Sequence, residues 1–229
     1  MLSVDMHSHL IPGIDDGSKS LDESLTMLRS MANLGYSKVI TTPHIMSDYY
    51  PNNQKNIKEG LEQLAKGIKA SDIKIEIEAA AEYFVDDYFL NLLETEEQLL
   101  TFSGKHILFE FSMIGESVDI LDVIFKLTSR GYIPILAHPE RYPYYANRLH
   151  LFESIYQQGC RLQVNLLSLC GHYGKQQQEL GWKLIKMDIV DYLGTDAHRI
   201  EHLNKISKLS TTRKFQNLVQ TKSFLNIQL

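Results

Sequence analysis

Short runs of apolar and β-branched residues alternate with segments of helical periodicity along this 229-residue sequence. Seven runs are predicted to be strands: 2–6, 38–41, 74–79, 107–109, 133–137, 162–164 and 189–193. Helical segments lie between most of them, and this order is typical of parallel strands that are joined by crossover helices. The sequence therefore predicts an α/β fold built on parallel strands.

The first helical segment carries the clearest signals. Ser20 and Glu23 have the spacing of a capping box, an apolar face follows them, and Gly35 suits the C-terminal cap. We expect a helix from about Leu21 to Leu34. Further helices are predicted around 57–68, 118–127, 149–158 and 177–187, and from 203 onward. Residues 83–105 fit neither period well, and we interpret them as an excursion beside the functional site.

Length and composition predict one domain that spans residues 1–229, since single α/β barrel domains commonly have this size. The 44% hydrophobic and 22% charged residues are ordinary proportions for a folded protein.

No apolar run approaches the ~18 residues of a membrane span. Asp5 and His7 also interrupt the N-terminus where a signal peptide needs an apolar stretch. We therefore expect a cytoplasmic protein.

The net charge and the cysteines restrict the chemistry. A net charge of −5 argues against broad nucleic-acid binding, which needs clustered lysine and arginine.

Cys160 and Cys170 lack the spacing of a zinc site and are too few for a disulfide framework, so we expect buried free thiols. Neither has an arginine six positions later, where Leu166 and Gln176 stand. Any phosphatase chemistry must therefore proceed without the phosphate-binding loop of cysteine-dependent phosphatases.

Polar residues follow the predicted strands, most of them of types that bind metals. They are His7, His9, His44, Glu82, Glu110, His138, Asn165, Asp196 and His198. In a parallel barrel these positions share one rim, where active sites are built, so residues that are distant in sequence should converge. The other histidines are expected to be structural or solvated: His106, His150, His172 and His202.

Taken singly, several of these residues also have a purely structural interpretation. The pair in His7-Ser8-His9 is as often a surface feature as a ligand pair, Asp15-Asp16-Gly17 is equally typical of a turn, and His44 suits a loop. Glu82 and Glu110 are harder to explain in this way, because each ends an apolar strand where a carboxylate is costly without a cation or hydrogen bonds. Their joint occurrence favours a nitrogen and oxygen site for two or three metals.

Seven motifs occur in a characteristic order: His7-x-His9, Asp15-Asp16-Gly17, Thr42-Pro43-His44, Ala81-Glu82, Phe109-Glu110-Phe111, Ala137-His138-Pro139-Glu140-Arg141 and Thr195-Asp196-x-His198. This set resembles the PHP (polymerase and histidinol phosphatase) superfamily. Within it, the sequence is most similar to the bacterial manganese-dependent protein-tyrosine phosphatases encoded with capsule and exopolysaccharide genes. The similarity runs from residue 1 to about residue 200 and includes residues 10–17 and 131–134.

The resemblance implies a distorted seven-stranded (β/α)7 barrel of the TIM type with two or three divalent metals, expected to be manganese, with iron or zinc as alternatives. Matched by position, the metal ligands are His7, His9, Asp16, His44, Glu82, Glu110, His138, Asp196 and His198. Arg141 is the implied phosphate-binding residue, and it joins Asp196 and His198 as a catalytic residue.

One position departs from the family pattern. Similar phosphatases carry a second phosphate-binding arginine several residues after the Asp-x-His motif, whereas this chain has Glu201, His202 and Leu203 there. Arg199 is the available substitute.

The expected reaction is attack on phosphorus by a metal-bound hydroxide, without a covalent enzyme intermediate. The expected substrate is a phosphotyrosine protein, the tail of a tyrosine kinase of capsular or exopolysaccharide synthesis. Two alternatives are a small-molecule phosphomonoesterase of the histidinol-phosphatase type and a non-catalytic metal-binding regulator. The sequence leaves the oligomeric state and the general acid open.

Overall fold

The computed structural model describes residues 2–116 and 118–229. Its strands are β1 (Val4–Asp5), β2 (Lys38–Thr41), β3 (His44–Ile45), β4 (Glu76–Ala79), β5 (Glu82–Phe84), β6 (His106–Glu110), β7 (Ile133–Ala137), β8 (Arg161–Asn165) and β9 (Tyr192–Gly194). Its α-helices are α1 (Leu21–Asn33), α2 (Gln54–Ala70), α3 (Asp87–Glu94), α4 (Ile120–Ser129), α5 (Leu149–Gln157), α6 (Leu166–Leu169), α7 (Lys175–Lys186), α8 (Ile200–Ser210) and α9 (Arg213–Thr221). Three 3₁₀ turns complete it: η1 (Pro139–Arg141), η2 (Pro143–Tyr145) and η3 (Leu225–Gln228).

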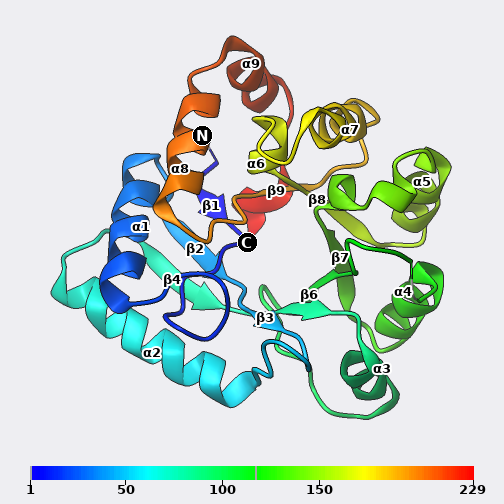
Figure 1. Cartoon of the computed structure of the whole chain (residues 1–229), viewed down its shortest axis with the longest axis horizontal. Coiled ribbons are helices and arrows are strands. Elements are labelled where there is room, and N and C mark those ends of the chain that lie inside the picture. Colours follow the sequence, from blue (N-terminus) through cyan, green and yellow to red (C-terminus); the bar gives the residue numbers. More distant parts are fainter. Residues whose placement is uncertain (1, 117) are drawn as a thin grey trace.

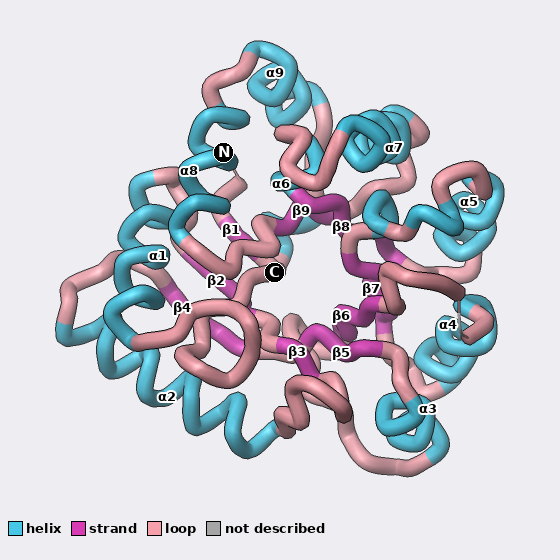
Figure 2. Tube along the Cα trace, viewed as in Figure 1, coloured by secondary structure: helices cyan, strands magenta, loops and turns pink. Residues whose placement is uncertain are grey.

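The strands lie at the centre and the helices surround them (Figures 1 and 2). All paired strands are parallel, as predicted. The described residues form nine strands in two sheets, with the orders β1-β2-β4 and β3-β5-β6-β7-β8-β9. The prediction of seven strands closed into one barrel is therefore not confirmed; the structure is an α/β fold with two parallel sheets.

The higher strand count arises because two strand positions are each divided. Pro43 has no N–H to donate to a ladder, and it separates β2 from β3. Ala80 and Ala81 separate β4 from β5 in the neighbouring position. The first half of each position belongs to the small sheet and the second half to the large one.

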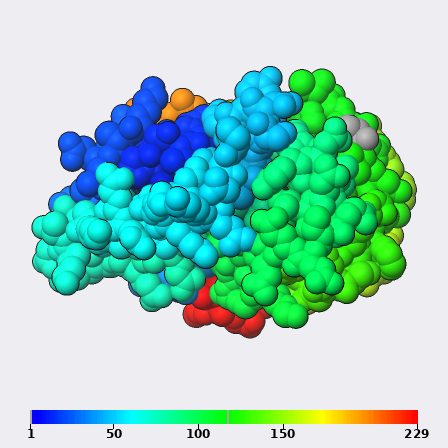
Figure 3. Space-filling view, turned by 90° about the horizontal axis from the view of Figure 1, so that it is seen from below, coloured from blue at the N-terminus to red at the C-terminus, as the bar shows by residue number. Residues whose placement is uncertain are grey.

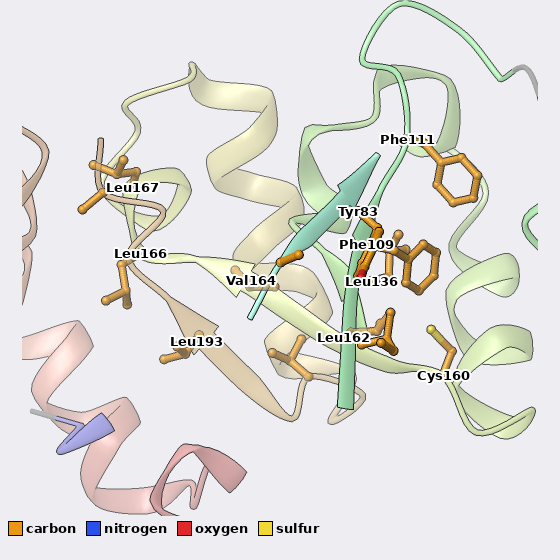
Figure 4. Close-up of a cluster of buried hydrophobic side chains, with 14 of the residues drawn as sticks. Tyr83, Phe109, Phe111, Leu136, Cys160, Leu162, Val164, Leu166, Leu167 and Leu193 are labelled. Atoms are coloured by element: carbon orange, nitrogen blue, oxygen red, sulfur yellow. The ribbon is translucent and has the colours of Figure 1, made fainter. Parts of the chain in front are cut away.

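Most of the strands are buried on both faces, and therefore they appear in the sequence as nearly continuous apolar runs, whereas β4 is partly exposed. Along β7, Ile135 and Ala137 join an inner cluster while Leu136 joins the outer core under the helices. This alternation is the two-residue period of a strand. Figure 4 shows part of the outer core, with Phe109, Leu136 and Leu162 on neighbouring strands.

The C-terminal segment covers one end of the strands. Leu225 and Leu229 pack against the inner cluster, and the buried Asn226 side chain donates to Val4 O (3.1 Å) and Leu193 O (2.8 Å). Figure 3 shows this segment, in red, on one face of the molecule. The carboxyl ends of the strands are therefore left to build the functional site.

Most of the predicted helices are confirmed, with local differences. In α1, Ser20 accepts a hydrogen bond from Glu23 N, but the Glu23 carboxylate accepts from Lys19 N, so the capping box is not reciprocal. Residues 83–105 are not an excursion, because they contain the end of β5 and the helix α3, which Asp86 caps. The segment after 203 contains the break between α8 and α9. None of the helices in the described part of the chain is long and apolar enough to span a membrane.

Candidate metal centre

The structure brings together all nine residues that the sequence proposed as metal ligands. Their donor atoms form four overlapping groups, and within each group the atoms lie within 4.8 Å of one another. The groups are His9, Asp16, His44 and His198; His7, His9 and Glu82; His7, His138 and Asp196; and His44, Glu82 and Glu110. Most of these residues lie at or just beyond the carboxyl end of a strand, the rim at which parallel α/β folds place their sites.

Glu82 occupies the middle of the centre and is fully buried. Its Oε2 lies 3.1 Å from His7 Nε2 and 3.2 Å from His44 Nδ1, and its Oε1 lies 3.0 Å from His138 Nε2. Burial acts to raise the pKa of the Glu82 carboxyl, but His7 and His44 outweigh it and hold the pKa well below its usual value. The ionised carboxylate is thus balanced by imidazoles rather than by water.

His44 provides a test of whether the residues suit a metal. Its Nδ1 is buried and lies 3.0 Å from Glu110 Oε1 and 3.2 Å from Glu82 Oε2, yet it has no hydrogen-bond partner of suitable geometry. A nitrogen and two carboxylate oxygens therefore converge without bonding to one another. This donor set suits a divalent cation that accepts mixed nitrogen and oxygen ligands.

Three of the histidines are oriented through their other ring nitrogen. His7 Nδ1 lies 2.8 Å from Gln163 Oε1, and His9 Nδ1 lies 2.8 Å from Asp15 Oδ2. His198 Nδ1 lies 3.0 Å from the backbone oxygen of Asp196. Such partners fix the tautomer and the ring orientation of histidines that bind metals.

The Asp15-Asp16-Gly17 segment is both a turn and a part of the centre. Asp15 Oδ1 accepts from Gly17 N at 2.9 Å, while Asp15 Oδ2 contacts His9 and accepts from His44 N at 3.2 Å. Burial acts to raise the pKa of Asp15, but His9 outweighs it and lowers the pKa. Asp16 Oδ1 lies 3.4 Å from His198 Nε2. The two interpretations of this motif are therefore compatible.

Asp196 links the metal centre to Arg141. Its Oδ2 accepts hydrogen bonds from Arg141 Nη1 (3.1 Å), Asn165 Nδ2 (2.6 Å) and Tyr173 Oη (3.2 Å). Its Oδ1 lies 3.5 Å from His7 Nε2. One oxygen is thus held by three donors while the other faces the imidazoles.

Two of the site residues have uncommon backbone conformations. His138 and Asp196 have φ angles of 35° and 49°, in the left-handed region that few residues other than glycine adopt. The Asp196 N–H donates to His7 O at 2.8 Å, and the Arg141 N–H donates to His138 O at 2.8 Å. Such conformations persist where surrounding contacts hold them, and they are frequent at functional sites.

Three residues that support the centre were not predicted from the sequence: Gln163, Tyr173 and Asp5. Gln163 contacts His7, and Tyr173 donates a hydrogen bond to Asp196. Asp5 is fully buried and accepts hydrogen bonds from the N–H and Oγ1 of Thr195, each at 2.9 Å, and burial raises its pKa to about 6. For Asp5 and Gln163 the available signal was a polar residue inside an otherwise apolar strand.

A cavity of about 460 Å³ lies over the centre. Arg141 lines it, and its guanidinium lies 4.3 Å from the centroid of the Tyr173 ring. Arg199 also lines it and donates through Nε to His202 Nε2 at 3.0 Å. His202 is buried, and that burial lowers its pKa to about 4. His172 also lines the cavity. The prediction that these histidines are structural or solvated is confirmed for His202, which is buried and accepts a hydrogen bond from Arg199.

The cysteines are free thiols, as predicted. Cys160 is buried and burial raises its pKa, whereas Cys170 is only half-buried. Among the described residues that line the cavity there is no cysteine.

Comparison with known proteins agrees with this geometry. The model of a family described as "Capsular polysaccharide synthesis, CpsB/CapC" matches residues 3–221. The chain is 27% identical to tyrosine-protein phosphatase YwqE of Bacillus subtilis over 201 residues, which are 88% of this chain and 79% of the relative. It is 26% identical to tyrosine-protein phosphatase CpsB of Streptococcus pneumoniae over 205 residues, 86% of this chain and 84% of that protein.

Solved structures give the same relation. A chain from the crystal structures of YwqE from Bacillus subtilis and CpsB from Streptococcus pneumoniae, described as unique metal-dependent tyrosine phosphatases, aligns with a TM-score of 0.82 and 25% identity. The alignment covers 98% of this chain and 94% of that one. A histidinol phosphate phosphatase from Lactococcus lactis aligns with a TM-score of 0.60 at 16% identity, over 97% of this chain and 94% of that one, and so shares the fold.

Proposed function

Since the chain belongs to the CpsB/CapC family of capsular polysaccharide synthesis, we propose that it is a metal-dependent phosphatase of phosphotyrosine proteins. One observation carries the proposal: nine histidine and carboxylate donors converge beneath a cavity that Arg141 lines. This arrangement combines a place for divalent metals with a cationic group for phosphate oxygens.

The nine donors are the proposed metal ligands. His7, His9, His44 and Glu82 each belong to two of the four groups, so neighbouring ions would have to share or divide these ligands. Glu82 would hold metal through its two carboxylate oxygens, which face His7 and His138 respectively. We propose two or three ions, with manganese as the expected metal and iron or zinc as alternatives.

Divalent ions, when bound, supply positive charge to the phosphoryl oxygens and lower the pKa of a coordinated water. The protein's own residues then orient the substrate. Arg141 presents a planar donor group that is held between Asp196 and the Tyr173 ring. Arg199 is the proposed second phosphate-binding residue, because the contact with His202 keeps its guanidinium at the cavity. The general acid stays unassigned.

The rim of the cavity suits an aromatic substrate. Tyr49 and Ile114 line it and are 71% and 97% exposed, and Met46 and Met113 also line it. Apolar side chains around a polar base favour a phosphorylated aromatic ring over phosphoserine. A phenolate leaves more easily than an alkoxide, so the demand for a general acid is also lower.

We also propose that the two sheets act as one distorted barrel. Glu82 N donates to Pro43 O at 3.1 Å across the divided strand positions, and Ser8 forms a parallel bridge with Ala197 between the segments that follow β1 and β9. These contacts would hold the rim of ligands together.

The test is a screen of phosphotyrosine peptides, phosphoserine peptides and small phosphoesters with added Mn²⁺, beside metal analysis of the purified protein. We expect bound metal and a preference for phosphotyrosine, with the tail of a capsule-synthesis tyrosine kinase as the proposed natural substrate. Metal-loaded protein that prefers small alkyl phosphates, or that hydrolyses none of these substrates, would contradict the proposal.

The ligand set has its own control. Glu110→Ala should lose metal and activity while the chain stays folded, whereas Glu62→Ala, at an exposed position of α2, should change neither. Unchanged metal content and turnover in Glu110→Ala would remove that residue from the set.

A further inference from the structure

A second hollow lies beside the metal centre, and we call it the basic groove. It has a volume of about 810 Å³, and it lies where α6, α7, α8 and α9 meet (Figure 1). The lining residues that matter here are His172, Trp182, Lys205, Lys208 and Lys214. None of them is among the proposed metal ligands or the phosphate-binding arginines.

The basic groove is joined to the cavity through His172, which lines both. On the cavity side, the ring of His172 lies 4.7 Å from that of Tyr173, whose hydroxyl donates to Asp196. On the groove side, His172 Nδ1 lies 2.6 Å from Lys205 Nζ. A substrate chain whose phosphorylated side chain occupies the cavity can therefore reach the groove by passing His172.

The charge of the groove is opposite to that of the whole chain, whose net charge is −5. Lys205, Lys208 and Lys214 are exposed, and in the described part of the chain no carboxylate lies within ion-pair distance of them. The acidic residue on the lining, Glu179, lies 3.6 Å from Lys175. Three ammonium groups that have no carboxylate partner among the described residues favour an anionic ligand in this hollow.

The groove also has an apolar floor. Leu169 and Leu209 are buried in it, and Lys214 Nζ lies 3.7 Å from the centroid of the half-buried Trp182 ring. A free anion needs no such floor, whereas a peptide can place side-chain carbon atoms on it while its carboxylates meet the lysines.

Resting on the proposed function, we propose that the basic groove binds an acidic stretch of the substrate polypeptide next to its phosphotyrosine. The groove thereby selects phosphotyrosine sites with aspartate or glutamate nearby. It increases affinity without taking part in the chemistry, because its lysines lie outside the cavity over the proposed metal centre.

The first experiment compares two phosphotyrosine peptides of the same length, one with Asp and Glu beside the phosphotyrosine and one with Asn and Gln in their place. The wild-type enzyme should show a KM roughly 3- to 30-fold lower for the acidic peptide, with similar kcat, and the difference should shrink at high salt. Equal KM values for the two peptides would overturn the inference and leave the proposed function intact.

The variant is Lys208→Gln/Lys214→Gln, and its control is Lys58→Gln/Lys66→Gln on the exposed face of α2. The groove variant should lose the preference for the acidic peptide and keep wild-type kcat/KM for p-nitrophenyl phosphate. The control should keep both. A preference that survives in the groove variant would overturn the inference.

A binding measurement separates this inference from the proposed function. Trp182 is the single tryptophan of the chain, so its fluorescence reports on the groove. Titration with the acidic peptide without phosphate should change the fluorescence of the wild type and change it much less in Lys208→Gln/Lys214→Gln. A fluorescence response in a protein without phosphatase activity would support peptide binding in the groove and contradict the proposed function. The absence of a response in an active phosphatase would contradict peptide binding in the groove and leave the proposed function intact.

Discussion

Arg141 Nη1 lies 3.1 Å from Oδ2 of Asp196, a carboxylate whose other oxygen faces the histidines of the metal centre. The proposed phosphate-binding group is therefore positioned relative to the proposed metals by a single side chain. Burial acts to lower the pKa of Arg141, but Asp196 outweighs it and raises the pKa, so the guanidinium stays charged. This geometry makes the identity of the cation at position 141 testable.

Arg141→Lys should keep metal content and stability but lower kcat/KM for an aryl phosphate by roughly ten- to a thousandfold. A lysine keeps the charge but lacks the planar pair of donors and the stacking on Tyr173. Asn165 and Tyr173 still hold Asp196. Steady-state kinetics beside metal analysis measure the effect.

Arg148→Lys is the matched control, because Arg148 also pairs with a carboxylate, Glu116, and lies over a tyrosine ring, but does not line the cavity. It should change kcat/KM little. Equal kinetics for Arg141→Lys and the wild type would make Arg141 a structural residue only.

Chelation should abolish activity and added Mn²⁺ should restore it, whereas thiol alkylation should have a weak effect. Cys160 is buried with a raised pKa, and the cavity lining contains no cysteine among the described residues. Aryl phosphate turnover after each treatment measures this. Complete inhibition by alkylation of a protein that keeps its fold and metal would be inconsistent with the proposed chemistry.

Gly17→Ala should displace His9 and reduce metal content, with a loss of roughly a hundredfold in kcat/KM. A Cβ at position 17 would overlap the backbone oxygen and the Cβ of His9. Gly115→Ala is the control, because a Cβ there meets no heavy atom within 4 Å. Metal analysis and kinetics of both variants test this prediction. Wild-type metal content in Gly17→Ala would contradict it, because it would show that the Cβ at position 17 does not displace His9 from the metal centre.

The metal-free protein should lose stability as the pH rises from about 6.5 to about 9. Burial acts to lower the pKa of His44, but Glu110 and Glu82 raise it to about 9, above the ~6.5 of an unfolded chain. The stability from protonated His44 is thus complete below about pH 6.5 and is lost as the pH rises through 9, by at most about 3 kcal/mol. The pKa values of His7 and His9 are also raised, so they act in the same direction.

Melting temperatures measured across this range, in chelator and in Mn²⁺, provide the check. His202, whose pKa is lowered to about 4, affects stability only below about pH 6.5 and does not enter this window. With Mn²⁺ the histidines would bind the ion in place of protons, so the decline should disappear. A flat profile in chelator would show that the imidazoles are not paired with the carboxylates in solution.

Local signals were sufficient for most of the helices and for the class of the fold. The boundaries of β2 and β7 are as predicted, because both are buried apolar runs with clear limits. The division at Pro43 was not predicted, although proline's missing donor was visible, because its effect depends on which strand lies alongside. The start of α4 was predicted near Val118, yet Asp119 caps the helix and Ile120 begins it.

The sequence by itself determined which donor residues meet in the centre. A carboxylate at the end of an apolar strand is costly to bury without a cation or hydrogen bonds, and parallel strands bring their carboxyl ends to one rim. His7 and Glu82 could therefore be placed together although 75 positions separate them.

Only the tertiary structure decided how the donors are oriented and what lies around them. The contacts of Gln163 with His7 and of Tyr173 with Asp196, and the left-handed backbone of His138, depend on side-chain directions that no spacing along the chain encodes. The basic groove belongs to the same class, because Lys205 meets His172 only after α8 has packed beside α6. Chemical type is a property of each residue, whereas direction and proximity arise from packing between distant segments.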